Sequence, residues 1–203
     1  MKALMVSMLA MASLAAHAQR TDAVKKLLEL GKDSVVRLAI ARLGEAGFAD
    51  IAPDQFDWLK VQTDGHDVRV IFDRSIQYFP MNTFVVHTAT VELVSTAVGW
   101  MPYGEPKDPF APIHLYEYTA ADRAVIAMVL SVQDWQQDKI ALMITEEADS
   151  YLITESTGSG EAVYRWHKTT GSLSEEGHAD YAPEEFDDGF REVDWENIKT
   201  SNK

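Results

Sequence analysis

The 203-residue chain carries 32 acidic residues against 18 basic ones and contains no cysteine. An acidic surface is repelled by phosphate groups, so we expect no nucleic acid and no anionic membrane surface as a partner. Without cysteine the chain forms no disulfides and no thiolate metal centre. It is nevertheless long enough to bury a core without such links, even without the N-terminal segment described next, which leaves about 185 residues.

The N-terminal 18 residues have the pattern of a secretory signal peptide. Lys2 provides a short charged region, an apolar run follows, and Ala16-His17-Ala18 has the form of a cleavage site. The apolar run is shorter than the roughly 20 residues that a membrane-spanning helix needs, and no later stretch reaches that length. We therefore expect residues 1–18 to be removed and residues 19–203 to be a bacterial periplasmic or secreted protein without a membrane span.

Residues 19–98 are predicted to form a first half, in which a helix precedes antiparallel strands. Apolar residues recur at helical spacing from Arg20 to Gly44, and Gly31 either packs against the sheet or splits the helix, with Asp33 or Ser34 as the cap of the second piece. Asp64-Gly65 then favours a two-residue hairpin turn between Phe56–Thr63 and His66–Asp73.

In a hairpin with a two-residue loop, Lys60 lies opposite Arg69. Two like charges in this position are unfavourable unless an acidic group neutralises them or an anion lies between them. We prefer Asp57 or Asp67 as the neutralising group. The alternative is an anion-binding spot formed by Lys60 and Arg69.

Phe84–Val98 is predicted to be one long strand, because Thr and Val dominate it and no Pro or Gly interrupts it. His87 is the polar residue on its apolar face. We interpret His87 as a core residue that is hydrogen-bonded to a neighbouring hydroxyl or carbonyl group. The alternative is catalysis by His87 with a carboxylate such as Glu92 or Asp73 at the mouth of a small pocket.

Residues 99–118 form a segment rich in proline and aromatic residues, which we call the strap. A long irregular segment inside a domain is generally a linker or a functional loop. We expect the strap to pack over the sheet, and the alternative is that it presents aromatic anchors to a partner. The candidate partner-binding residues are Trp100, Tyr103, Phe110 and Tyr116, together with Trp166 from the second half.

Residues 119–180 are predicted to repeat the plan of a helix followed by strands. Thr119 and Asp122 have the spacing of a capping box, and the helix they open is apolar nearly all round, so we expect it to be deeply covered. The predicted strands are Lys139–Thr145, Ser150–Glu155 and Ala162–Lys168, after which Thr170-Gly171 turns the chain into a short strand, Ser172–Glu175.

The end of this half, Ala-Val-Tyr164-Arg-Trp166-His-Lys-Thr-Thr170-Gly171-Ser-Leu173, resembles the end of PepSY-type exported domains, where a strand runs into a Thr-Gly turn and a final strand. The resemblance covers about 60 residues, 119–178, and it departs from the family pattern at Arg165–Lys168. It implies a module that binds or inhibits other proteins, peptidases among them, and does not catalyse.

The C-terminal tail, residues 181–203, interleaves acidic and apolar residues. Phe186, Phe190 and Val193 are spaced as in a short amphipathic helix. We expect the tail to be either an arm docked on the domain or a disordered segment that binds a partner. A structural, envelope-associated protein that docks through this acidic tail is therefore one functional alternative.

The sequence contains no recognisable catalytic, metal-binding or phosphate-binding motif. Five histidines remain after the cleavage site, and none has the spacing of a metal pair. We therefore expect no metal and no cofactor. The leading interpretation is an exported binding module with an α+β fold, in which two halves of helix and antiparallel strands place their helices on one face of a curved sheet. Its partner would be another exported protein or a peptide.

Overall fold

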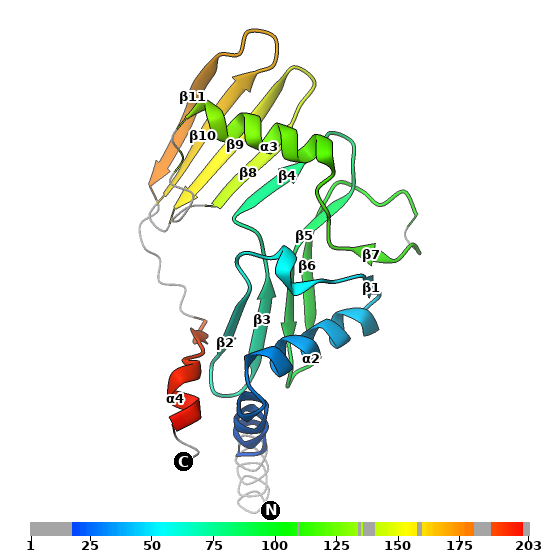
Figure 1. Ribbon diagram of the computed structural model, residues 1–203, viewed down its shortest axis with the longest axis vertical. Helices are drawn as coiled ribbons and strands as arrows, with labels where there is room; N and C mark the ends of the chain where they lie inside the picture. Colours follow the sequence, from blue (N-terminus) through cyan, green and yellow to red (C-terminus); the bar gives the residue numbers. More distant parts are fainter. Residues whose placement is uncertain are drawn as a thin grey trace, which may run out of the picture.

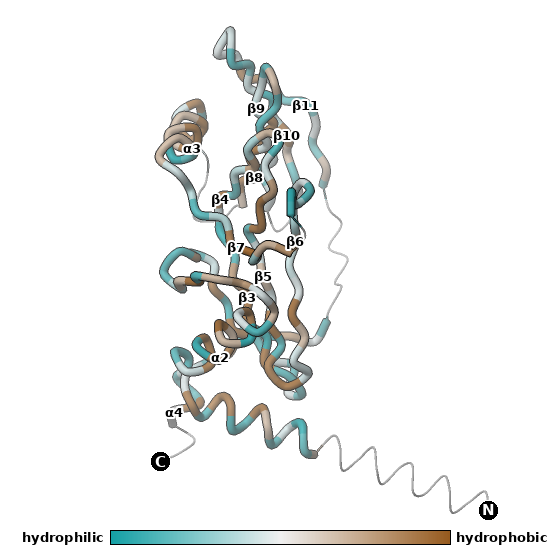
Figure 2. The backbone as a smooth tube through the Cα atoms, turned by 90° about the vertical axis from the view of Figure 1, so that its right-hand side faces the viewer, coloured by the Kyte–Doolittle hydropathy of each residue, from teal (hydrophilic) through white to brown (hydrophobic). Residues whose placement is uncertain are grey.

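The computed structural model describes residues 18–108, 110–133, 135, 141–157, 160–180 and 188–200. Within them the chain forms helices and mostly antiparallel strands, so the expected α+β class is confirmed. The described strands build two five-stranded sheets, which lie one above the other along the long axis (Figures 1 and 2), and one two-stranded sheet. The prediction of a single curved sheet is therefore wrong. The expected signal peptide lies outside the described part except for its last residue.

Two helical segments open the first half. Residues 18–29 are helical, and helix α2 (Lys32–Glu45) follows a break at Gly31. Gly31 has a φ of 83°, a left-handed conformation that glycine adopts without steric cost. The suggested split is confirmed, but neither Asp33 nor Ser34 caps the second piece, because Gly31 itself occupies the cap position without a side-chain hydrogen bond.

The lower sheet has the strand order β12-β2-β3-β5-β6. Its strands are β2 (Lys60–Thr63), β3 (Val68–Phe72), β5 (Val85–Glu92), β6 (Val98–Tyr103) and β12 (Arg191–Glu192). Alternate residues of β3, together with Val86, Ala89 and Val91 of β5, share a hydrophobic core with α2. The members of this core that come from α2 are Val35, Val36, Ala39 and Leu43. Buried positions thus recur at every second residue of β3 and at helical spacing on α2, as the sequence pattern predicts.

The β2–β3 hairpin exists, but its predicted register is wrong by two residues. Lys60 lies opposite Ile71, and Arg69 lies opposite Gln62. The loop is longer than expected because the carboxylate of Asp64 accepts hydrogen bonds from two main-chain N–H groups of the loop, at 2.8 and 2.7 Å. This turn, stabilised by a side chain, replaces the two-residue turn that the Asp-Gly pair predicts.

The predicted long strand Phe84–Val98 is a hairpin. β5 ends at Glu92, and the chain turns through residues 93–97 into β6. The carboxylate of the buried Asp67 accepts hydrogen bonds from the main-chain N–H groups of Val94 and Ser95, both at 2.8 Å. Because Asp67 belongs to the preceding hairpin loop, this stabilisation of the turn comes from a residue distant in sequence.

The upper sheet has the order β11-β10-β9-β8-β4. Its strands are β4 (Ile76–Phe79), β8 (Ala141–Glu146), β9 (Ser150–Thr157), β10 (Gly160–His167) and β11 (Leu173–Asp180). The predicted strands of residues 139–168 are confirmed where they are described, and residues 139–140 lie outside the described part. β4 leaves the lower sheet after β3, pairs in parallel with β8, and is followed by the return to β5. This crossover joins the two halves of the fold, which we call the lower and the upper half after the sheets that they contain.

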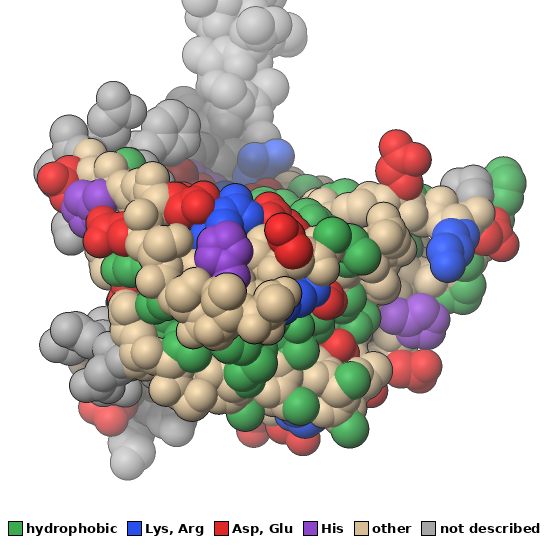
Figure 3. Space-filling model, turned by 90° about the horizontal axis from the view of Figure 1, so that it is seen from above, with side chains coloured by type: hydrophobic (Ala, Val, Ile, Leu, Met, Phe, Trp, Pro, Cys, Tyr) green, Lys and Arg blue, Asp and Glu red, His purple; other side chains and the backbone are tan. Residues whose placement is uncertain are grey.

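Helix α3 (Ala120–Val132) lies across the upper sheet (Figure 1). The predicted capping box is confirmed, since the Thr119 side chain accepts from the Asp122 N–H and the Asp122 carboxylate accepts from the Thr119 N–H. The expectation of deep burial is wrong. Only Asp122 and Val129 of the helix are buried, and hydrophobic side chains reach the surface at this end of the molecule (Figure 3).

The strap is more regular than expected. Its first residues form most of β6, and farther along β7 (Ile113–His114) pairs in parallel with β1 (Phe48–Ala49), which follows α2. A short 3-10 helix, Pro53–Gln55, lies between β1 and β2. The strap therefore packs against the lower half through strand pairing as well as through its aromatic rings.

The described part of the C-terminal tail docks on the lower sheet. β12 pairs with β2, Val193 is buried, and helix α4 (Trp195–Thr200) contributes Trp195 and Ile198 to the same core. Residues 181–187, which include Phe186 of the predicted helix, lie outside the described part. The expectation of a docked arm is confirmed for residues 188–200, although strand and helix replace the continuous helical spacing.

Candidate functional site

His87 lies in β5 where the register is irregular between Val86 and Thr88, and it is only 1% exposed. Its Nε2 donates to the carbonyl oxygen of Tyr78 at 2.8 Å, and its Nδ1 accepts from Nη1 of Arg74 at 3.3 Å. A ring that donates from one nitrogen and accepts at the other is neutral. Burial, with a contribution from the charge of Arg74, lowers the pKa of His87 to about 4. His87 is thus a satisfied core residue, bonded to a carbonyl group as we preferred.

The catalytic alternative for His87 lacks its carboxylate. Glu92 pairs with Arg69, and Asp73 accepts hydrogen bonds from Thr88 (2.9 Å) and Gln77 (2.8 Å). Among the described residues, no carboxylate or hydroxyl group forms a hydrogen bond with His87. The alternative of a His–carboxylate pair is therefore wrong for both acids, because Glu92 is paired with Arg69 and Asp73 holds the crossover between β3 and β4.

The alternative of an anion-binding spot at Lys60 and Arg69 loses its basis, because the observed register does not place these two residues opposite each other. Arg69 forms ion pairs with Glu92 (3.0 Å) and with Asp188, and its guanidinium lies 3.5 Å from the ring centre of Phe190. Lys60 instead lies over the ring of Trp58 at 5.5 Å. The preferred neutralising groups are also wrong. Asp57 binds Ser75, and Asp67 binds the turn after β5.

The predicted aromatic residues divide into two groups. Phe110, Trp100 and Tyr103 are 93%, 39% and 36% exposed, respectively, and all three belong to the strap. Tyr116 is half-buried and donates to the carboxylate of Asp122 at 3.0 Å, and burial raises its pKa to about 12. Trp166 lies in the upper sheet, stacked on Tyr151 with ring centres 5.8 Å apart. Only the first group remains available for contact with a partner.

Of this exposed group, Trp100 lines a groove of about 610 Å³. β6 contributes Trp100 and Pro102 to the groove, and the rest of its lining comes from residues 82–84 and from described residues of the strap between Gly104 and Ile113. Trp100 is held by an edge-to-face contact with Phe48, at 5.4 Å between ring centres. On the opposite face of β6, Met101 is 74% exposed. We call Trp100, Met101, Tyr103 and Phe110 the aromatic edge.

The main chain of β6 is the free border of the lower sheet. Glu92 N–H donates to the Ala97 carbonyl at 2.9 Å, so by the alternation of an antiparallel ladder Gly99 and Met101 also face β5. The N–H and C=O groups of Val98 and Trp100 then point away from the sheet. Pro102, the next outward position, has no N–H, which suits an edge. The free edge is thus short and ends at a proline.

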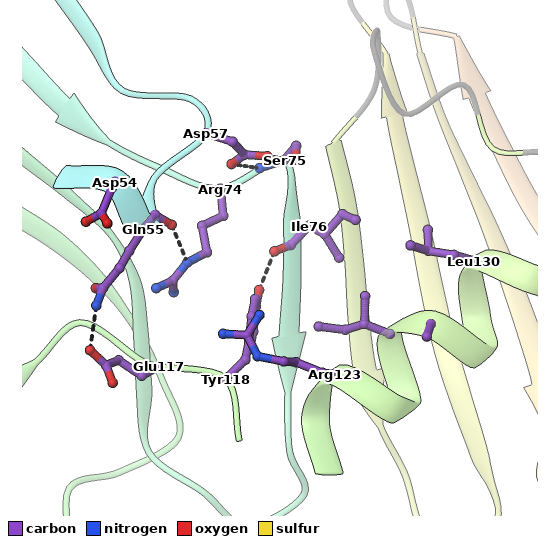
Figure 4. Close-up of a pocket in the computed structure, with 12 residues that line it drawn as sticks. Asp54, Gln55, Asp57, Arg74, Ser75, Ile76, Glu117, Tyr118, Arg123 and Leu130 are labelled. Atoms are coloured by element: carbon purple, nitrogen blue, oxygen red, sulfur yellow. Dashed lines mark hydrogen bonds between the residues drawn. The ribbon is translucent and has the colours of Figure 1, made fainter. Parts of the chain in front are cut away.

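A second concave site lies where the chain crosses between the sheets (Figure 4). This junction pocket has a volume of about 580 Å³. The 3-10 helix, the crossover residues between β3 and β4, and helix α3 all contribute to its walls. Its polar or charged lining residues include Asp54, Gln55, Asp57, Arg74, Glu117 and Arg123, and its aliphatic ones are Ile76, Ile126, Ala127 and Leu130.

Side-chain carboxylates fix the crossover that carries Arg74. Asp73 accepts from the Arg74 N–H at 2.8 Å as well as from Gln77 and Thr88. Asp57 accepts from the N–H of Ser75 at 2.9 Å and from its hydroxyl group. The three residues Asp73, Arg74 and Ser75 between β3 and β4 therefore have a defined conformation, in which the Arg74 side chain points inward.

Arg74 is the central residue of the junction pocket and is only 6% exposed. Its Nε donates to the Gln55 carbonyl at 3.2 Å, and Nη1 donates to the Tyr116 carbonyl and to His87. The guanidinium lies 4.9 Å and 5.0 Å from the ring centres of Phe56 and Tyr118. Burial lowers its pKa. These contacts stabilise a cation inside the protein without using a carboxylate.

The sequence interpretation missed the junction pocket. The available signal was the charged triplet Asp73-Arg74-Ser75 between two apolar strands, because such a residue either faces water or needs buried partners. Arg123 could also have been identified from the sequence, since the capping box at Thr119 places it on the first turn of α3. What no sequence pattern reveals is that β4 joins the other sheet, which brings these residues together.

Among the described residues, no helix is long and apolar enough to span a membrane, and no group of three or more histidine or acidic side chains is placed to hold a metal ion. No protein-family model matches the chain, and comparisons with curated proteins and with solved structures also gave no match. The PepSY-like character of residues 119–178 therefore stays a prediction, and the functional argument depends on the geometry of this chain.

Proposed function

We propose that the protein is an exported, non-catalytic binding module that docks an extended segment of another exported protein along β6. The observation that carries the proposal is the aromatic edge, where apolar side chains are exposed, Trp100 lines a groove, and main-chain groups of β6 are unpaired. Export to the periplasm or out of the cell is part of the proposal, and it rests on the N-terminal sequence pattern.

An extended peptide is the occupant that suits this border best. Val98 and Trp100 offer outward main-chain donors and acceptors, which a neighbouring strand pairs with directly. Side chains of an added strand alternate between the two faces of the sheet, so they would meet Met101 on one face and Trp100 on the other. Exposed aromatic and methionine side chains are also typical of the centre of a protein interface.

We further propose that both halves follow the plan inferred from the sequence, with a helix on one face of an antiparallel sheet, and that the second half is PepSY-like. The two hydrophobic clusters support this plan, because one combines α2 with β3 and β5 and the other combines α3 with β4, β8 and β9. In this view the lower half supplies the docking edge.

The test begins with a photo-crosslinking residue in place of Met101, in cells of the source organism. The matched control carries the same residue at Met143, which is 41% exposed in the upper sheet. We expect a crosslinked protein from position 101 that is absent from position 143. The dissociation constant of the purified partner is then measured by calorimetry.

The double variant Met101→Ser/Phe110→Ser should bind the partner at least tenfold more weakly than the unmodified chain, whereas Met143→Ser should bind it equally well. The factor follows from the loss of two apolar contacts of about 1 kcal/mol each. Equal crosslinking at both positions, or an unchanged affinity of the double variant, contradicts docking at the aromatic edge.

A further inference from the structure

The junction pocket contains a buried cation without an ion pair. Arg74 is 6% exposed, and among the described residues no carboxylate lies within ion-pair distance of it. Its Nη2 forms no hydrogen bond with a described residue, although Nε and Nη1 do. Buried charges in proteins are normally paired, because desolvation of an unpaired one is costly. Arg74 lines the pocket, so the unbonded side of its guanidinium suits an anionic group of a ligand.

A second polar group at the pocket also lacks a partner. The side-chain oxygen of Gln55 is buried and accepts no hydrogen bond from the described residues. The amide cannot simply turn over, because its nitrogen donates to the Glu117 carboxylate at 2.5 Å and an oxygen in that place would be repelled. Gln55 lines the pocket, and a small movement of its side chain would let a ligand supply the missing donor.

Two of the three carboxylates that line the pocket lie apart from Arg123, and the third, that of Asp57, is bonded to Ser75 (Figure 4). Arg123, on the first turn of α3, forms no ion pair with a described residue and adds a second positive group beside Tyr118. Asp54 and Glu117 lie on the side of Gln55, away from α3. A simple anion would meet these carboxylates as well as the arginines. A ligand that carries both an anionic and a cationic group satisfies both sides.

The third part of the pocket is aliphatic. Ile76 comes from β4, and Ile126 and Leu130 come from the pocket side of α3. Figure 4 shows Ile76 and Leu130 on the side away from Asp54 and Glu117. A small number of polar groups beside an apolar wall is the usual composition of a small-molecule site, and about 580 Å³ is within the usual size range.

We propose that the junction pocket binds a zwitterion with an aliphatic side chain, either a free amino acid or a short peptide. Its carboxylate lies at Arg74 and Arg123, its ammonium group donates to Gln55 and faces the acidic side, and its side chain packs on α3. This site is separate from the aromatic edge, so it does not depend on partner docking.

Calorimetric titration of the full mature chain tests the proposal with L-leucine and with leucyl-leucine, which distinguishes the two sources. Leucinamide lacks the carboxylate, 4-methylpentanoate lacks the ammonium group, and glycine lacks the side chain. We expect saturable binding of leucine, of leucyl-leucine or of both, and at least tenfold weaker binding of each of the three analogues. No binding of leucine and of leucyl-leucine at millimolar concentrations overturns the proposal, as does equal binding of leucinamide.

Variants at exposed positions keep the fold intact during this test. Arg123→Gln should weaken binding at least tenfold, and Asp54→Asn should weaken it severalfold, because each removes one charge that faces the ligand. Arg37→Gln, at an exposed position of α2, is the matched control and should bind as the unmodified chain does. Unchanged affinity in Arg123→Gln overturns the assignment of the carboxylate.

Discussion

His87 gives the most quantitative prediction, because it is buried as a neutral ring. Its pKa is about 4 in the folded protein and about 6.5 when the chain is unfolded. Between these values the unfolded chain binds a proton that the folded chain does not, so the free energy of unfolding falls as the pH falls. The loss begins as the pH drops through about 6.5 and is complete below about 4.

The magnitude follows from the two pKa values. Each pKa unit corresponds to about 1.4 kcal/mol, so the free energy of unfolding should fall by about 2 kcal/mol between pH 8 and pH 5 because of His87 alone. The variant His87→Gln keeps a donor for the Tyr78 carbonyl and an acceptor for Arg74, but it does not titrate. It should therefore lack this part of the pH dependence.

The assay is urea unfolding of the unmodified chain and of His87→Gln at several pH values. Acidic groups contribute equally to both curves, so the difference between the slopes isolates His87. His114→Gln is the control, because His114 is exposed, and it should follow the unmodified chain. Parallel curves for the unmodified chain and His87→Gln would show that His87 protonates freely in the folded state, and the structural role assigned to it would fail.

Three further substitutions test the stability of particular elements by urea unfolding at pH 7. Asp67→Ala should lower the free energy of unfolding by about 3 kcal/mol, because it leaves the N–H groups of Val94 and Ser95 without acceptors. A loss below about 0.5 kcal/mol would mean that the turn after β5 does not need Asp67. Val193→Ala should cost about 2 kcal/mol, since it removes buried methyl groups between the tail and the lower sheet, and no loss would mean that the tail is not docked. Thr119→Ala should cost about 1 kcal/mol through the lost cap of α3, and an unchanged stability would argue against the capping box.

Local patterns in the sequence predicted the local elements of this fold. The capping box at Thr119, the strands of the upper sheet and the break at Gly31 all follow from residues that are neighbours in the chain. The same reasoning failed at Phe84–Val98. Its alternation continues smoothly into the turn, and the carboxylate that stabilises the turn belongs to Asp67.

The junction pocket was out of reach for a related reason. Arg74 and Arg123 are about 50 positions apart in sequence, and they meet because β4 pairs with β8 across the two halves. Strand pairing over such separations depends on the whole hydrophobic pattern, which gives little information about which sheet a short strand joins. By contrast, the exposed rings of the strap were predicted individually from composition, although β6 gives Trp100 and Tyr103 a regular arrangement.

Amide hydrogen exchange of β6 tests the central proposal most directly. In the free protein the outward N–H groups of Val98 and Trp100 should exchange quickly, whereas Gly99 and Met101, whose N–H groups face β5, should exchange slowly. With the partner captured at position 101 bound, the account predicts that Val98 and Trp100 become protected as well, because an added strand pairs with them. Unchanged exchange at these two residues in the complex would contradict docking along β6.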